Sequence, residues 1–150
     1  MKKREIHGMS NTKEYFIWAE MRYRCNNPNN HAYKDYGGRG IKVCDRWNNS
    51  FLNFYKDMGD KPEGMSIDRV NNNGDYSLDN CRWANKQTQQ RNQRKKSTNK
   101  SGVKGVFWHK RLKKWRAMIT VNYKNISLGC YSDINEARKA REEAEIKFFS

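Results

Sequence analysis

The sequence predicts an α+β protein: a helical first part that ends in a strand–loop–strand–helix unit, then a three-stranded antiparallel sheet packed on one helix. Apolar residues recur at helical spacing before residue 60 and alternate between residues 105 and 129, as in strands. Between these two patterns, residues 91–100 contain no apolar side chain. We therefore expect two parts, residues 1–93 and 101–150, joined by a basic linker at 94–100.

The first expected helix spans residues 12–25. Thr12 can serve as its N-cap, and the turn residues NNPNN at 26–30 end it. Its apolar positions are Phe16, Ile17, Met21 and either Tyr23 or Cys25. A glycine-broken turn follows at residues 33–41 (YKDYGGRGI), and Arg39 within it is either a turn residue, a contact to a phosphate or base edge, or both.

A second short helix is expected at residues 50–58, where Ser50 is a suitable N-cap and Gly59 a suitable stop. Residues 61–64 (KPEG) form a turn into the next segment. The small core of this part is expected to contain Trp18, Trp47 and Trp83.

Residues 66–92 (SIDRVNNNGDYSLDNCRWANKQTQQRN) follow the order strand, polar loop, strand, helix. Asp68 ends the first strand, Asn80 opens the second, and amide side chains fill the helix. A hard divalent cation such as Mg²⁺ or Mn²⁺ takes oxygen ligands. Asp68 can supply a carboxylate and Gln89 an amide oxygen, with Asn92 one turn later as the competing amide. This layout predicts a one-metal nuclease site.

In the second part, strands are expected at residues 105–108, 114–121 and 125–129, with tight connections. A helix capped by Ser132 or Asp133 then presents an apolar stripe that can cover one face of the sheet. The opposite face should stay open and carry the cations. The expected covered face holds Trp115, Ala117, Ile119 and Val121; the open face holds Arg116, Met118 and Thr120; the helix stripe is Ile134, Ala137, Ala140, Ala144 and Phe148.

The charge is concentrated in one segment. The chain has a formal net charge of +15, and residues 91–132 carry 12 Lys and Arg but no Asp or Glu. Such a field attracts a polyanion, and the interleaved Trp108, Trp115 and Tyr123 favour nucleic acid over a merely solvated surface. Duplex DNA is the expected partner, with RNA as an open alternative. No basic amphipathic helix favours a membrane surface.

Hydropathy and cysteine content bear on the compartment. The hydrophobic fraction is 35%, and no apolar run approaches the ~18 residues that span a bilayer or follows Met1 as a signal peptide would. We expect a cytoplasmic, non-secreted protein with free thiols. As an alternative, a Cys₃His zinc site could form from Cys25, Cys44, Cys81 and His31, although no CxxC pair supports it.

Residues 101–149 resemble the AP2 (plant ERF-like) DNA-binding domain through GVKGV at 102–106, KWRAMI at 114–119, SLG at 127–129 and the helix from Glu136. In that family a three-stranded sheet enters the major groove. Phe107, Met118 and Ser127 depart from the family pattern, so no target sequence is carried over. The resemblance implies that the DNA-facing residues are Lys104, His109, Arg111, Arg116, Thr120, Asn125 and Ser127.

Residues 67–84 (IDRVNNNGDYSLDNCRWA), with Gln89 and Asn92, resemble the HNH (ββα-metal) endonuclease family, as found beside AP2-like modules in phage-type homing enzymes. The resemblance implies that Asn80 holds the loop. The family's general-base histidine is replaced by Arg69, which cannot accept a proton but can clamp a phosphate. Tyr76, if its pKa is depressed, or His31 would then be the base.

The expected activity is metal-dependent hydrolysis of DNA phosphodiesters by a module at 1–93, docked on the duplex by the module at 101–150. The competing class is a non-catalytic DNA-binding regulator. Whether the chain is a monomer or a homodimer stays open. A monomer would more naturally nick one strand, and a double-strand break would need a dimer or two events.

Overall fold

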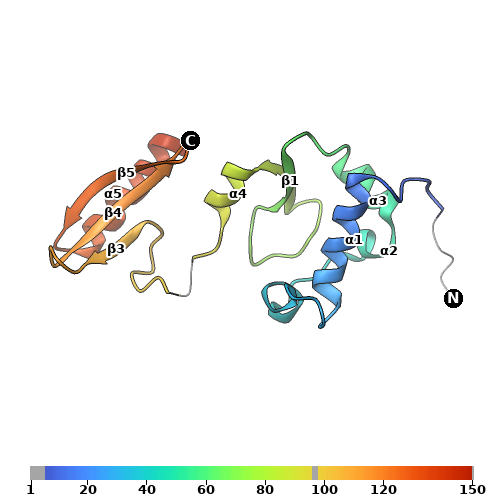
Figure 1. Cartoon of the computed structure of the whole chain (residues 1–150), viewed down its shortest axis with the longest axis horizontal. Coiled ribbons are helices and arrows are strands. Elements are labelled where there is room, and N and C mark those ends of the chain that lie inside the picture. The colour runs from blue at the N-terminus through green and yellow to red at the C-terminus, as the bar shows by residue number, and fades with distance from the viewer. Residues whose placement is uncertain (1–5, 96–97, 150) are drawn as a thin grey trace. The chain divides into compact units, whose positions relative to one another are not determined.

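The computed structural model describes residues 6–95 and 98–149, which form two compact units with a boundary between Gln93 and Arg94 (Figure 1). The expected α+β class is confirmed: helices accompany a two-stranded sheet in the first unit and a three-stranded sheet in the second. No helix in the described ranges has the length and apolar character needed to cross a membrane.

The first unit contains a helical half followed by a hairpin and a short helix. Its 3₁₀ turns η1 and η2 occupy the expected glycine-broken turn, and α2 was not expected from the sequence. The elements are α1 (Lys13–Asn26), η1 (Tyr33–Asp35), η2 (Gly37–Arg39), α2 (Asp45–Asn49), α3 (Phe51–Met58), β1 (Met65–Arg69), β2 (Cys81–Asn85) and α4 (Lys86–Asn92).

Both N-caps expected in the first unit are confirmed. The Thr12 hydroxyl accepts a hydrogen bond from the Tyr15 amide at the start of α1, and Ser50 does the same for Asn53 in α3. The predicted apolar stripe of α1 is wrong in part, because Phe16 and Tyr23 are 61% and 50% exposed. The buried stripe is instead Trp18, Met21 and Cys25.

The core of the first unit is aromatic, and its tryptophans also make hydrogen bonds. Trp47, Phe51 and Phe54 are fully buried, and the Trp47 and Phe54 rings meet edge to face at 5.2 Å. Each indole N–H donates to an oxygen of another segment: Trp18 to the Trp47 carbonyl at 2.6 Å, Trp47 to Asp57 Oδ2 at 2.7 Å and Trp83 to the Met58 carbonyl at 2.7 Å. The core role expected of the three tryptophans is therefore confirmed.

Strands β1 and β2 pair antiparallel, with Asp68 opposite Arg82 and Ile67 opposite Trp83. The loop between them returns to the helical half, where Tyr76 bridges Val43 through backbone hydrogen bonds. Helix α4 starts directly after β2, capped by the Asn85 side chain, which accepts from the Thr88 amide at 2.9 Å. This connection brings α4 back beside β1.

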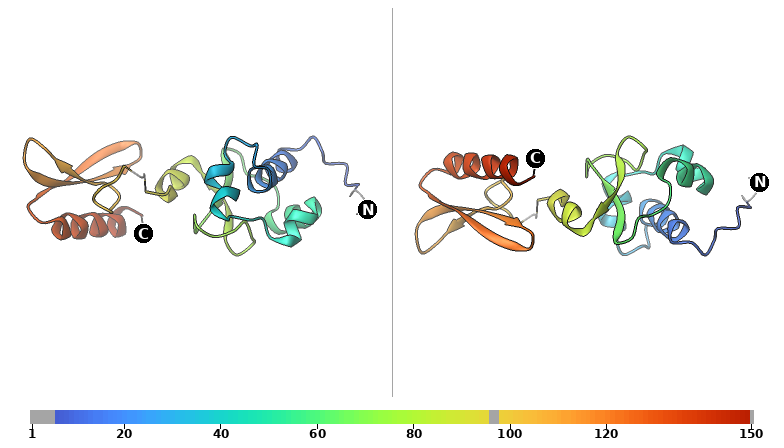
Figure 2. Two further views of the ribbon diagram at one scale, coloured as in Figure 1. Left: turned by 90° about the horizontal axis from the view of Figure 1, so that it is seen from below. Right: turned by 90° about the horizontal axis from the view of Figure 1, so that it is seen from above.

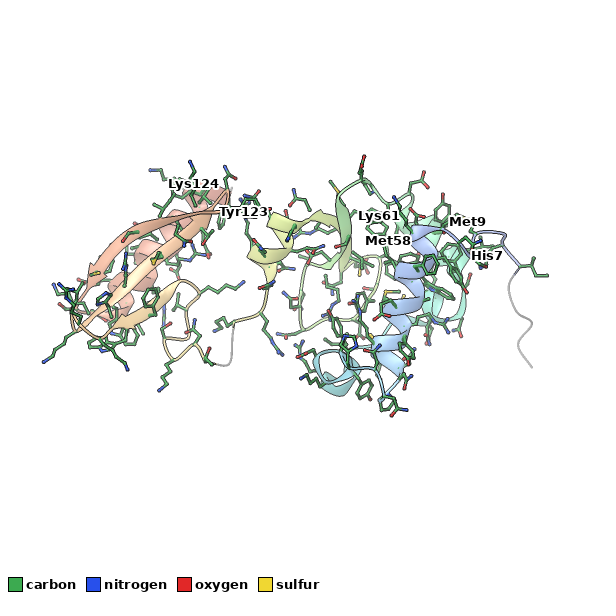
Figure 3. All side chains as sticks on the ribbon, in the orientation of Figure 1. His7, Met9, Met58, Lys61, Tyr123 and Lys124 are labelled. Atoms are coloured by element: carbon green, nitrogen blue, oxygen red, sulfur yellow. The ribbon has the colours of Figure 1, made fainter. Side chains whose placement is uncertain are left out.

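The second unit is a β3–β4–β5 antiparallel meander covered on one face by α5 (Figure 2). Ala117 and Ile119 are buried on the covered face, as expected, and Ala137 and Ala144 of α5 are buried with them. The β4–β5 turn places Asn122 and Tyr123 at positive φ, and Tyr123 and Lys124 lie at its tip (Figure 3). The elements are β3 (Val106–His109), β4 (Lys114–Val121), β5 (Lys124–Tyr131) and α5 (Ile134–Phe149).

Phe54→Ala should destabilise the first unit by about 3–5 kcal/mol, because it opens a cavity under the fully buried ring. Leu52→Ala on the same helix, where the side chain is 42% exposed, should cost about 0.5 kcal/mol. Urea unfolding followed by tryptophan fluorescence measures both. Equal losses for the two variants would contradict this assignment of the core.

Candidate active site and nucleic-acid interface

A polar cleft of about 270 Å³ opens beside β1 and α4. Its lining combines two arginines, Arg24 and Arg69, with two tyrosines, Tyr36 and Tyr76. Asp68 is the single acidic side chain among the described lining residues. The cleft thus brings together the predicted acid, one predicted cation and one predicted base, all from the first unit.

Asp68 is held by two neighbours. Its side chain is only 9% exposed and pairs with the Arg82 guanidinium across the hairpin at 3.2 Å. The Asn92 amide nitrogen donates to both Asp68 carboxylate oxygens, each at 3.2 Å, and also to the Arg69 carbonyl oxygen. Because all three acceptor atoms are oxygens, the nitrogen of the Asn92 amide faces them.

The two amides considered as metal ligands differ in position: Asn92 is hydrogen-bonded to Asp68, whereas Gln89 lines the cleft. Gln89 lies in the first turn of α4, where its amide nitrogen donates to the Ser66 hydroxyl, the Ser66 carbonyl and the Ala84 carbonyl. Gln89 lines the cleft together with Asp68, but these hydrogen bonds hold its amide nitrogen on the hairpin. Asn92, at the last turn of α4, is the amide beside the acid.

The donor set fits a hard divalent cation with two protein ligands. An electropositive N–H group already bridges the two carboxylate oxygens, and rotation of the Asn92 amide would present its oxygen on the same side. Asp68 also keeps lone pairs beyond those used by Arg82. Within residues 6–95 and 98–149, no cluster of three or more His, Cys, Asp or Glu side chains is placed to hold a metal, so any further ligands would come from water or substrate.

Arg69 occupies the position where the HNH resemblance implies a histidine, and its side chain is buried. Its Nη1 donates to the Gly74 carbonyl at 2.7 Å, and its guanidinium lies 4.8 Å from the Tyr76 ring centre and 5.3 Å from that of Tyr36. Arg69 therefore anchors the β1–β2 loop as well as lining the cleft.

Tyr76 does not meet the condition under which it was expected to act as a base. It is only 2% exposed, and its hydroxyl oxygen accepts a hydrogen bond from Arg24 Nη2 at 2.5 Å. Burial raises the pKa of the Tyr76 phenol well above its usual range, and the nearby Arg24 and Arg69 charges oppose that rise only in part. The condition of a depressed pKa at Tyr76 is therefore not met, because desolvation outweighs the nearby cations.

The remaining predicted residues of the first unit divide into loop holders and a surface residue. Asn80 holds the loop as expected: its Oδ1 accepts from the Asn71 amide, and its Nδ2 donates to the Asn71 and Asp75 carbonyls. Arg39 donates to Asn73 Oδ1 at 2.6 Å and so joins the glycine-rich turn to the same loop. His31 is exposed and does not line the cleft.

The cysteines of the first unit are free thiols, with Cys25 buried and Cys44 and Cys81 half-buried. Burial raises the pKa of Cys81 to about 12 and also raises the pKa of Cys25. Thiols with raised pKa values are poor metal ligands, because zinc binds the thiolate. The part of the chain described here does not assemble the Cys₃His alternative.

The second unit presents an open sheet face opposite α5. Strand alternation and register place five of the predicted contacts on this open face: His109, Arg116, Thr120, Asn125 and Ser127. Thr120 donates to Asn125 Oδ1 at 2.7 Å across the β4–β5 pair. The Arg116 Nε atom is buried and has no hydrogen-bond partner among the described residues. An acceptor on a ligand could satisfy it.

The position expected for Lys104 is wrong. This residue was expected on the open face, but it lies half-buried beside α5, in a pocket that it shares with Arg141 and Glu145. The reason is local: Gly105 has a φ of +71°, and the preceding carbonyl of Lys104 turns toward α5 to accept from Arg141 Nε at 3.0 Å. Arg111, the other predicted contact outside the strands, is exposed in the β3–β4 turn.

Comparison of the chain with family models, curated proteins and solved structures gives no match. The HNH and AP2 resemblances therefore rest on the motifs quoted above. Sequence inspection missed Arg24 and Tyr36, which line the cleft from α1 and the glycine-rich turn. No local pattern marks them, because only the folded loop brings their segments together.

Tyr76→Phe should remove part of the alkaline instability of the first unit. Folding holds the Tyr76 proton more tightly than the unfolded chain, whose phenols ionise near pH ~10. Stability from this group is complete below about pH 10 and is lost as the pH rises further. The free-energy gap between wild type and variant in urea unfolding should therefore shrink above about pH 10.

Raising the pH also destabilises the folded first unit through ionisation of the Cys25 and Cys81 thiols. Wild type and Tyr76→Phe both contain these thiols, so their effect cancels in the difference between the two. A gap that stays constant between about pH 8 and 11 would mean that Tyr76 is not buried as a neutral phenol.

Proposed function

We propose that this chain is a metal-dependent DNA endonuclease of the HNH type, with a second unit that docks on duplex DNA. The observation that carries the proposal is the Asp68 carboxylate, which accepts hydrogen bonds from Asn92 and lines a cleft together with two arginines. Hard oxygen donors beside guanidinium groups suit a cation and a phosphate together.

The residues of the cleft supply binding and charge compensation. Asp68 and Asn92 would hold the cation, and a bound Mg²⁺ would polarise the phosphate and stabilise the charge that develops on the leaving oxygen. Arg69, fixed by the Gly74 carbonyl and the tyrosine rings, can offset negative charge on the phosphate without proton transfer. Arg82 neutralises Asp68 from the hairpin side.

One observation favours the alternative, a DNA-binding regulator without catalysis. Neither candidate base meets the requirement for a positioned group that accepts a proton near neutral pH: Tyr76 is buried with a raised pKa, and His31 lies outside the cleft lining. The two functions share DNA binding and differ only in hydrolysis, so a cleavage assay separates them.

The second unit supports a DNA partner through its charge and its open face. Residues 91–132 carry 12 basic and no acidic side chains, and the open sheet face holds Arg116 beside the Thr120–Asn125 pair. Arg and Asn make the commonest bidentate contacts to guanine and adenine in the major groove. The AP2 resemblance implies that a three-stranded sheet contacts the DNA bases.

Plasmid DNA incubated with the protein and Mg²⁺ or Mn²⁺ should be nicked, and EDTA should abolish the nicking. Asp68→Asn should reduce the rate about 100-fold or more, because it removes the one carboxylate among the described residues that line the cleft. Asp79→Ala, which removes an exposed acid of the same loop, is the matched control and should cleave normally. Absence of nicking with either metal would leave the regulator as the function.

Arg116→Ala should weaken duplex binding by about tenfold or more, in line with the ~1–3 kcal/mol of a good base contact. Lys104→Ala removes the same charge from the α5 side and should have a much smaller effect. Fluorescence anisotropy with a labelled duplex measures both. Equal losses would place the interface elsewhere on the unit, and equal competition by single-stranded RNA would favour the RNA alternative.

A further inference from the structure

Two arginines and two tyrosines form a stack in the cleft. The Arg24 guanidinium lies 4.4 Å from the Tyr36 ring centre and 5.1 Å from that of Tyr76. Arg69 lies 5.3 and 4.8 Å from the same two rings, which are stacked with centres 6.3 Å apart. Two positive charges therefore share one pair of aromatic faces, although like charges repel.

Within the described residues, neither cation has an acidic partner. Other arginines do form ion pairs, Arg46 with Asp57, Arg82 with Asp68 and Arg141 with Glu145, whereas Arg24 and Arg69 form none with a described carboxylate. Arg24 donates one hydrogen bond, to the Tyr76 hydroxyl, and its Nε atom is buried without a partner. A buried guanidinium donor left unpaired is costly, so the arrangement suits an anion that binds there.

The surroundings fix the direction of both guanidinium groups. Arg69 is held by the Gly74 carbonyl and Arg24 by the Tyr76 hydroxyl, while the rings restrict rotation of both. Each guanidinium has five N–H donors, and these contacts use only one of them on each side chain. The Asn92 amide, which donates to both Asp68 and the Arg69 carbonyl, places the stack next to the acid in the same cleft.

We propose that Arg24 and Arg69 together bind one phosphodiester group of the DNA strand in this cleft, with Arg24 as a substrate-binding residue contributed by α1. Tyr76 is then a positioning residue that orients Arg24 and does not exchange protons with substrate. This inference rests on DNA as the substrate, but not on cleavage. A phosphodiester is favoured because planar guanidinium groups pair with phosphate oxygens in a bidentate fashion.

The test measures binding of the full chain to a labelled duplex in EDTA, at salt concentrations from about 50 to about 200 mM. Arg24→Gln should weaken binding and make the slope of log Kobs against log salt less negative by about 0.9, the value for one lost phosphate contact. Arg22→Gln is the matched control: it lies on the same helix and stacks on Trp18, but it does not line the cleft. An Arg24→Gln slope equal to that of Arg22→Gln would overturn the proposal.

Two milder variants keep the test decisive if Arg24→Gln fails to fold. Arg24→Lys keeps the positive charge but loses the planar guanidinium group with its paired N–H donors. Its slope of log Kobs against log salt should therefore match wild type while its affinity for DNA falls. Tyr76→Phe keeps the ring and removes the hydroxyl anchor, so its affinity should fall at constant slope and any cleavage activity should keep its pH profile. Wild-type affinity in Arg24→Lys, or a shifted pH profile in Tyr76→Phe, would contradict the roles assigned here.

The outcomes separate this inference from the proposed function. If Arg24→Gln shows the predicted slope change but the wild-type protein never nicks DNA, the phosphate-binding role of the two arginines stands and the nuclease proposal fails. If the wild-type protein nicks DNA but Arg24→Gln binds DNA like Arg22→Gln, the nuclease proposal stands and the phosphate-binding role of Arg24 fails. Wild-type protein that does not bind duplex DNA would overturn both.

Discussion

The first unit depends on a stack of side chains from four separate segments. Arg24 comes from α1, Tyr36 from the glycine-rich turn, Arg69 from β1 and Tyr76 from the loop. Among the described residues of this unit the sheet has two strands, so few backbone hydrogen bonds connect distant segments. The cation–π and hydrogen-bond contacts of this stack join those segments and form part of the cleft lining.

Close packing in the turn makes the stack possible. A Cβ atom on Gly37 would lie 2.1 Å from the Cys25 carbonyl oxygen and 2.3 Å from the Tyr33 ring, so only glycine lets the turn approach α1 this closely. On the other side, Asn80 spans the loop, and Tyr76 pairs with the backbone beside Val43. Tyr76 thus belongs to the core and to the cleft wall at once, which explains why its hydroxyl is held away from solvent.

Local chemistry could be predicted from the sequence, and long-range placement could not. The caps at Thr12 and Ser50 and the alternation along β4 depend on neighbouring residues, and the structure confirms them. Which of Gln89 and Asn92 contacts Asp68 depends on how α4 returns to β1 across more than twenty residues of chain, and spacing alone does not decide it. Arg24 gave no local signal, because its partners Tyr36 and Tyr76 are 12 and 52 positions away.

The two units use positive charge in different ways. Residues 1–90 carry 15 basic and 11 acidic side chains, a net of +4, whereas residues 91–132 carry 12 basic and none acidic. A broad field of the second kind attracts a polyanion, but salt screens it beyond about 8 Å at physiological ionic strength. Attraction of that kind cannot fix one phosphate oxygen to within a hydrogen-bond length. If the cleft binds a phosphodiester as proposed, its precision would come from cations held in fixed positions, and Arg24 and Arg69 are held in this way by Tyr76 and Gly74.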